Sequence, residues 1–216
     1  MYDLEVKMRG RQSNELSVRT YNIVIGLILL WGVLINIIMC VCCTEIFMQW
    51  NPVAIIIGYF VVAIAGIYLS ESSNALVSFI GYNMVVIPIG VVLSIALVDY
   101  DQISIMNALV TTVAITLLMI LLGSIFPQIF FSMGRVLFVC LTGVVICEII
   151  FLLIGFSTPS IWDWIVALIF CGYIGYDWAE AQTKPRTLDN AVDSVVALYL
   201  DIVNLFIRLL SASDDD

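Results

Sequence analysis

The chain has 216 residues, of which 62% are hydrophobic and 12% are charged, and its mean hydropathy is +1.12. A soluble domain is usually nearer half apolar and a quarter charged, so a soluble fold of this length could not bury so much apolar surface. The net charge is −9 and only eight residues are Lys or Arg, so nucleic acid is not an expected partner. The composition predicts an all-α integral membrane protein whose solvent is the lipid bilayer.

Three regions follow one another along the chain. Residues 1–20 are polar and lack the apolar stretch of a secretory signal peptide, so the first hydrophobic span is expected to serve as the insertion signal. Residues 21–210 are predicted to form one membrane domain. Residues 211–216 form an acidic tail that ends in three aspartates.

Seven apolar segments approach the length of roughly 17–25 residues that a membrane helix needs. They are Tyr21–Cys43, Pro52–Ser70, Ala75–Val98, Ile105–Phe126, Val136–Phe156, Ile161–Tyr176 and Val192–Leu210. Short polar loops separate most of them, and Pro88 predicts a kink within the third. We therefore expect a bundle of seven transmembrane helices.

The basic residues predict how the bundle is oriented. With seven spans, the amino-terminal segment and the loops after spans two, four and six share one side of the membrane, and seven of the eight basic residues lie there. Only Arg208 lies on the other side. Because cytoplasmic loops are enriched in Lys and Arg, the amino terminus is expected in the cytoplasm, and the short loops suit a bacterial plasma membrane. A count of six spans with a re-entrant last segment would place both ends inside.

Asp201 is the most informative residue, because it lies within the last apolar segment between Leu200 and Ile202. An ionisable residue inside a membrane helix is costly and is a functional candidate by default. It belongs to a stripe of polar or small residues that recur at alternating steps of four and three, as neighbours on one helix face do. The stripe comprises Asn190, Ser194, Ala197, Asp201, Asn204 and Arg208. Such a stripe must face protein or water, which predicts that the last helix lies at the centre of the bundle.

Asp177, at the end of the sixth segment, is the expected partner of Asp201. Each lies twelve residues from Asp189, so a turn near Asp189 would bring both carboxyl groups to one depth. Two carboxylates in a low-dielectric interior should share a proton and titrate as a coupled pair. The alternatives are that Asp177 is solvated at the membrane interface, and that Asp201 pairs with Arg208.

Other ionisable residues are less decisive. Glu148 could add a third interior carboxylate or pair with an amide such as that of Asn83, and Asp193 is interpreted as a solvated residue near the helix start. There is no histidine, phosphate-binding loop or nucleophile motif, so no enzyme activity is expected. The six cysteines lie in or beside apolar segments and are interpreted as packing thiols, and no tightly bound cofactor is expected.

The sequence of Ala197–Phe206, Ala-Leu-Tyr-Leu-Asp-Ile-Val-Asn-Leu-Phe, resembles the last-helix signature of the Bax inhibitor-1 family. Gly175-Tyr176-Asp177 at the end of the sixth segment is also similar. The resemblance implies seven helices with the last one central, and a pH-sensitive leak of calcium across the membrane. It also implies that Asp177 and Asp201 form a di-aspartyl sensor.

Two departures from the family pattern concern this sensor. Trp178-Ala179 stand where many members have Thr-Gln, and Pro52–Ser70 lacks the arginine that pairs with the aspartates in some bacterial members. A lysine-rich tail of some animal members is also replaced by an acidic one.

Three functions are compatible with these residues. The first is a calcium-permeable channel or leak in which Asp177 and Asp201 act as a proton-operated gate and also as oxygen ligands for calcium. Asn204, Glu148, Asp193, Ser194 and Arg208 are then candidates for polar residues of the interior or the ion path. The second is a proton-coupled cation exchanger that uses the same carboxylates. The third is a membrane scaffold or stress-response protein in which the polar residues only fix helix packing.

Overall fold

The computed structural model describes residues 15–156 and 159–214, and within these ranges the chain is helical with no β-strand. The helices are α2 (Val18–Cys42), α3 (Thr44–Phe47), α4 (Pro52–Ser70), α5 (Ala75–Ala96), the 3₁₀ helix η1 (Leu97–Asp99), α6 (Gln102–Ile125), α7 (Pro127–Ile154), α8 (Ser160–Ala181) and α9 (Leu188–Asp214). The predicted all-α class is confirmed. Residues 1–14 of the predicted amino-terminal segment and 215–216 of the acidic tail lie outside the described residues.

Six helices of the described chain are long and apolar enough to cross a membrane: α2, α4, α5 continued by η1, α6, α7 and α9. The remaining long helix, α8, has 22 residues and carries Asp163 and Asp177 among its apolar side chains. The exact count of seven spans therefore stays a prediction. Many large apolar side chains are exposed, among them Leu152 at 81% and Leu168 at 73%, as expected of helices whose solvent is lipid.

Capping residues explain where several helices begin. Ser17 accepts a hydrogen bond from the Thr20 amide at the start of α2, and Asn51 and Asp101 cap α4 and α6 in the same way. α7 begins at Pro127, well before the predicted Val136, because proline suits the first helical position and polar residues can continue a helix. Apolarity alone therefore predicted the existence of the spans better than their ends.

The chain forms two compact units, and α9 contributes to both. The first unit comprises residues up to Ala96 together with Ala181–Val196. The second comprises Leu97–Glu180 together with Ala197–Asp216.

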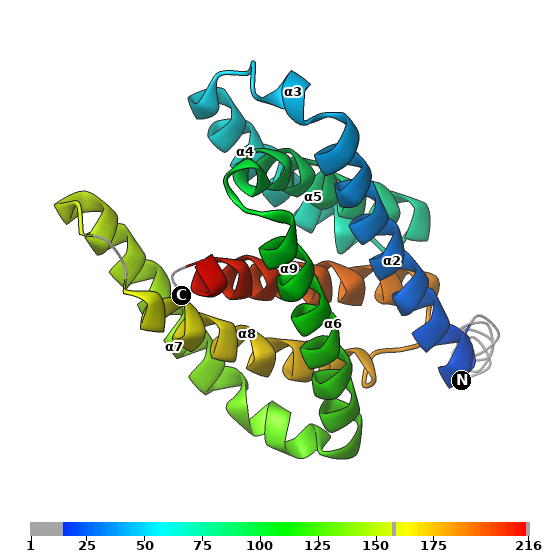
Figure 1. The fold of residues 1–216 in the computed structure, drawn as a ribbon. Coiled ribbons are helices and arrows are strands. Elements are labelled where there is room, and N and C mark those ends of the chain that lie inside the picture. Colours follow the sequence, from blue (N-terminus) through cyan, green and yellow to red (C-terminus); the bar gives the residue numbers. More distant parts are fainter. Residues whose placement is uncertain (1–14, 157–158, 215–216) are drawn as a thin grey trace, which may run out of the picture. The chain divides into compact units, whose positions relative to one another are not determined.

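In the first unit, α5 packs against α2 and α4 (Figure 1). The α4–α5 contact is close because glycines face each other: a Cβ atom added to Gly81 would lie 2.6 Å from the Gly66 carbonyl oxygen. The Tyr82 hydroxyl joins α5 to α2 by donating to the Ile28 carbonyl at 3.0 Å. Small residues at a helix–helix contact let backbones approach, which is a common packing solution in membranes. α5 continues as a helix through Pro88.

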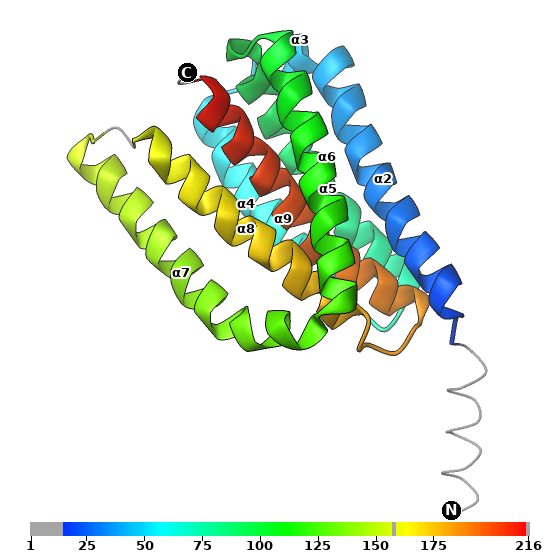
Figure 2. The ribbon, with the colours of Figure 1, turned by 60° about the horizontal axis from the view of Figure 1, so that its bottom comes forward.

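In the second unit, α7 runs alongside α8 (Figure 2). Here too glycines provide the space: a Cβ atom added to Gly172 would lie 2.6 Å from Leu137 Cδ2, and Gly175 lies directly against the Phe130 ring. The Trp178 indole N–H donates to the Ser124 hydroxyl at 2.7 Å and so fastens α8 to α6. The end of α8 that carries Asp177 is thus held by contacts on both sides.

Candidate functional site

Two residues of the polar stripe on α9, Ser194 and Asp201, are buried, and the other four are partly exposed. Asp201 is 7% exposed and Ser194 is 3% exposed, while apolar residues of the same helix such as Leu198 and Leu205 are fully buried. α9 is the most buried of the six candidate spans, since 61% of its most apolar stretch is buried. That these polar side chains avoid lipid, and that α9 lies at the centre of the bundle, both stay predictions.

The structure brings Asp177 of α8 and Asp201 of α9 together, close enough for a side-chain hydrogen bond between their carboxyl groups. A carboxylate only accepts hydrogen bonds, so a bond between two such groups needs a proton on one of them. Oδ2 of Asp201 is buried and has no hydrogen-bond partner among the described residues. Tyr173 of α8 lies near enough to interact electrostatically with both aspartates. The arrangement can hold one proton, and after losing it can present two negative charges.

The two aspartates meet, and the chain turns close to Asp189 but a few residues before it. Asp189 lies in the first turn of α9, and the connection between α8 and α9 is formed by residues 182–187. The connection ends at residue 187 because α9 begins at Leu188, four residues before the predicted apolar segment that starts at Val192.

Arg208 belongs to a second charged cluster, which joins α7, α8 and α9. Its Nη1 donates to Asp163 Oδ1 at 2.9 Å, and its Nη2 donates to Glu148 Oε1. The Ser211 hydroxyl donates to the other Asp163 oxygen at 2.9 Å, and the Trp162 indole N–H donates to Glu148 at 3.2 Å. Arg208 therefore pairs with these two carboxylates rather than with Asp201. Glu148 likewise has Arg208 and Trp162 as partners rather than an amide.

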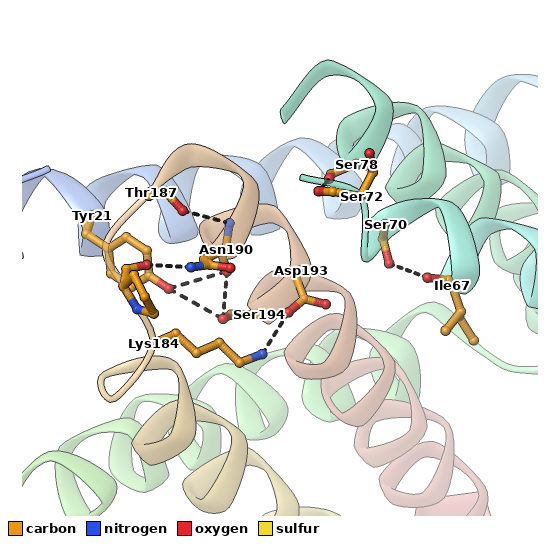
Figure 3. A network of polar contacts seen from close by, with 11 residues as sticks. Tyr21, Ile67, Ser70, Ser72, Ser78, Lys184, Thr187, Asn190, Asp193 and Ser194 are labelled. Atoms are coloured by element: carbon orange, nitrogen blue, oxygen red, sulfur yellow. Dashed lines mark hydrogen bonds and ion pairs between the residues drawn. The ribbon is translucent and has the colours of Figure 1, made fainter. Parts of the chain in front are cut away.

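In the first unit, Asp193 forms an ion pair with Lys184 (Nζ to Oδ2, 2.7 Å), and its side chain is 30% exposed (Figure 3). It is thus a paired residue inside α9 rather than a solvated residue at the helix start, because α9 already begins at Leu188. Ser194 donates to the Asn190 carbonyl at 2.8 Å, and the buried Tyr21 hydroxyl of α2 lies within 3.5 Å of the Ser194 hydroxyl. The contact of the Tyr21 hydroxyl with Ser194 joins the start of α9 to α2.

A polar pocket of about 270 Å³ adjoins this network in the first unit. It is lined by Ser70, Glu71, Ser72, Ser73, Asp189, Asn190 and Asp193. Asn204, in the second unit, uses its amide to donate to the Leu200 carbonyl of its own helix at 2.7 Å. Asn204 is therefore bonded locally, within α9.

Sequence reasoning missed Asp163 and Lys184 as partners of predicted residues. Asp163 is 5% exposed, and its place between Trp162 and Trp164 suggested the membrane interface, where a carboxylate would be solvated. The sequence did contain a usable signal. Arg208 lies within an apolar segment and therefore needs a carboxylate partner, and Asp163 lies near the start of the preceding segment.

No group of three or more Asp, Glu, Cys or His side chains in the described part of the chain is arranged to hold a metal ion. Asp177 and Asp201 could supply only some of the roughly 6–8 oxygen ligands that calcium takes, so water would have to supply others.

The six long apolar helices of the described residues define an all-helical integral membrane protein. The family model described as inhibitor of apoptosis-promoting Bax1 matches residues 13–213, and the chain belongs to this Bax inhibitor-1 family. This match confirms the resemblance to the family that the sequence around Asp177 and in the last helix indicated.

Relatives occur in plants and bacteria. Protein LIFEGUARD 3 of Arabidopsis thaliana is 40% identical over 81 residues, which are 37% of this chain and 32% of the relative. The BI1-like protein of the same plant is 39% identical over 83 residues, 38% of this chain and 32% of the relative. An uncharacterized membrane protein of Streptococcus pyogenes is 32% identical over 128 residues, 56% of each chain. The chain thus spans about a third of the length of the two plant relatives it matches.

Proposed function

We propose that this protein is a calcium-permeable leak channel whose conductance is set by the protonation of Asp177 and Asp201. The single observation that carries the proposal is the meeting of these two carboxyl groups between α8 and α9, with one oxygen of Asp201 buried and unpartnered among the described residues. Membership of a family that is linked to calcium leak supports the choice of ion.

The proposed gate depends on whether the two carboxyl groups attract or repel each other. With a proton shared, the two carboxyl groups attract each other through a hydrogen bond and hold α8 against α9. Without it, two like charges repel at short range in a medium where charge is poorly screened, and the helices separate. The separated carboxylates attract cations and repel anions. The flux of calcium is therefore expected to rise as pH rises through the titration of the pair.

Two side chains of the second unit bear on the charge near the pair, those of Tyr173 and Arg208. Tyr173 faces both aspartates and is neutral near pH 7. The guanidinium of Arg208 forms ion pairs with Glu148 and Asp163. In the proposed closed state, a proton shared between the two carboxyl groups removes one of their negative charges.

The test measures calcium entry into liposomes that contain the purified protein and a calcium-sensitive dye, over a series of external and internal pH values. Wild type should show low flux in acid and higher flux toward neutral pH. Asp201→Asn should show low flux at every pH, because an amide donates to Asp177 whether or not protons are available. Asp99→Asn, at an exposed position, is the matched control and should behave as wild type.

Equal flux at every pH in wild type and in Asp201→Asn would refute the proton gate. Stoichiometric proton counterflow with saturation would instead assign the same carboxylates to an exchanger. Absence of flux, with only a loss of stability on changing either aspartate, would assign them to packing. We also propose the orientation with the amino terminus in the cytoplasm, which accessibility labelling of single cysteines in intact cells can test.

A further inference from the structure

The cluster around Arg208 fastens three helices of the second unit at a different level from the aspartate pair. Arg208 is seven residues from Asp201 along α9, or roughly 10 Å at the rise of a helix. On α8, Asp163 is fourteen residues from Asp177, or roughly 21 Å. α8 and α9 therefore have two separate polar connections, and the second also includes Glu148 of α7.

The two connections respond differently to pH. The bond between Asp177 and Asp201 needs a proton on a carboxyl group. The cluster is held by ion pairs between the guanidinium of Arg208 and the carboxylates of Glu148 and Asp163, so it does not depend on a proton shared between two carboxyl groups. The other side chains bonded to these carboxylates, those of Trp162 and Ser211, do not titrate in the usual pH range.

The cluster is also well placed to resist separation. Asp163 is almost fully buried, and both of its oxygens are bonded to α9, one to Arg208 and the other to Ser211. Glu148 receives bonds from both Arg208 and Trp162, so it ties α7 to the same point. Charged pairs inside a membrane have poor alternatives when broken, because neither water nor lipid replaces the partner.

We infer that the Glu148–Asp163–Arg208 cluster is the fixed end about which α8 and α9 separate when the aspartate pair opens. Arg208 is then a positioning residue: it never meets the permeating ion, but it confines the movement to the end of the two helices where Asp177 and Asp201 lie. This inference rests on the proposed function, since it describes how the proposed gate moves.

The first experiment follows the two ends separately through tryptophan fluorescence. Trp178 adjoins Asp177, and Trp162 is bonded to Glu148 of the cluster. In variants that keep only one of the five tryptophans, with phenylalanine at the other four positions, the emission maximum of Trp178 should shift between about pH 5 and about pH 8, whereas that of Trp162 should not. After Arg208→Gln, Trp162 should shift as well.

The second experiment keeps all tryptophans and measures calcium flux in liposomes. Arg208→Gln should raise the flux in acid several-fold, so that the ratio of flux at neutral to acidic pH falls toward one, because two carboxylates without their arginine no longer hold the helices together. Arg135→Gln, an exposed arginine on α7, is the matched control and should keep the wild-type ratio.

The outcomes separate the inference from the proposed function. An equal pH-dependent shift at Trp162 and Trp178 in the wild-type background, or an unchanged flux ratio in folded Arg208→Gln, would overturn the fixed end while leaving the proton gate intact. An unchanged emission at both tryptophans together with flux that does not depend on pH would overturn the gate and the fixed end together.

Discussion

Replacing Gly81 by alanine should destabilise the first unit strongly. A Cβ atom at Gly81 would lie 2.6 Å from the Gly66 carbonyl oxygen and 2.8 Å from the Leu69 carbonyl carbon. Both atoms belong to the backbone of α4, so no side-chain rotation can relieve the overlap. The helices must move apart along their whole contact, and dispersion contacts are lost on both sides.

The size of the effect follows from these distances. Overpacking typically costs about 1–3 kcal/mol, and backbone atoms that cannot yield place Gly81→Ala at the upper part of that range. At roughly 2–4 °C per kcal/mol for a chain of this size, the apparent melting temperature should fall by about 5–10 °C. Gly58→Ala on α4 is the control, because nothing lies within 4 Å of an added Cβ atom there. The control should be neutral or slightly stabilising, since alanine favours a helix by about 1 kcal/mol over glycine.

The assay is thermal unfolding in detergent, followed by the fraction of protein that elutes as a monodisperse peak after heating. Gly66→Ala should behave like Gly81→Ala, because its Cβ atom would lie 2.7 Å from the Gly81 carbonyl oxygen. If Gly81→Ala and Gly58→Ala unfold at the same temperature, the close backbone contact between α4 and α5 is refuted.

Three further changes test other parts of the structure. Gly175→Ala would place a Cβ atom 2.6 Å from Phe130 Cδ1, so it should displace α8 and blunt the pH response of calcium flux, and adding Phe130→Ala should restore part of it. Tyr82→Phe removes the hydrogen bond from α5 to α2 and should cost about 0.5–1.5 kcal/mol in thermal unfolding. A hydrogen bond from the helix backbone lowers the pKa of Asp101, so its capping of α6 is fully present above the ordinary value of 3.8 and is lost as pH falls through the lowered pKa. Protection of the amides at the start of α6 from hydrogen exchange, taken relative to their intrinsic rates at each pH, should therefore fall in acid, but not in Asp101→Asn, whose amide caps without titrating.

Each of these results can contradict the structure. Wild-type flux in Gly175→Ala would mean that α7 and α8 are not in contact at this point. An unchanged melting temperature in Tyr82→Phe would mean that the hydroxyl is not bonded in the folded protein. The same acid dependence of hydrogen exchange in wild type and Asp101→Asn would locate the titrating group elsewhere.

The membrane class and the positions of the helices could be predicted because apolar side chains in runs of this length have no other stable environment than lipid or a protein core. The polar stripe of α9 was equally predictable, since residues such as Ser194 and Asp201 recur at the helical period within an apolar segment. The ends of the helices were less predictable. The apolar segments end at polar residues, but backbone hydrogen bonding continues α8 to Ala181 and starts α9 at Leu188.

The pairing of Asp177 with Asp201 also depends on helix ends and loop length, which the apolar pattern does not predict. Asp177 is four residues from the end of α8, or roughly 6 Å, and Asp201 is thirteen residues from the start of α9, or roughly 20 Å. An equal spacing about one turn therefore does not explain the pairing. The connection 182–187 can span up to roughly 20 Å when extended, which is enough to offset the difference. The length of such a connection cannot be read from apolarity, and neither could the choice of Asp163 and Glu148 as partners of Arg208.

The charges on α8 also bear on how the protein enters the membrane during synthesis. Asp163 and Asp177 lie near the two ends of α8, and each makes this helix less favourable in lipid by itself, although less so than a carboxylate at the centre of a membrane helix. Their partners Arg208 and Asp201 both belong to α9, which is synthesised afterwards. A ribosome-bound chain that ends after α8 should therefore leave this helix only loosely inserted, and emergence of α9 should draw it fully into the bilayer.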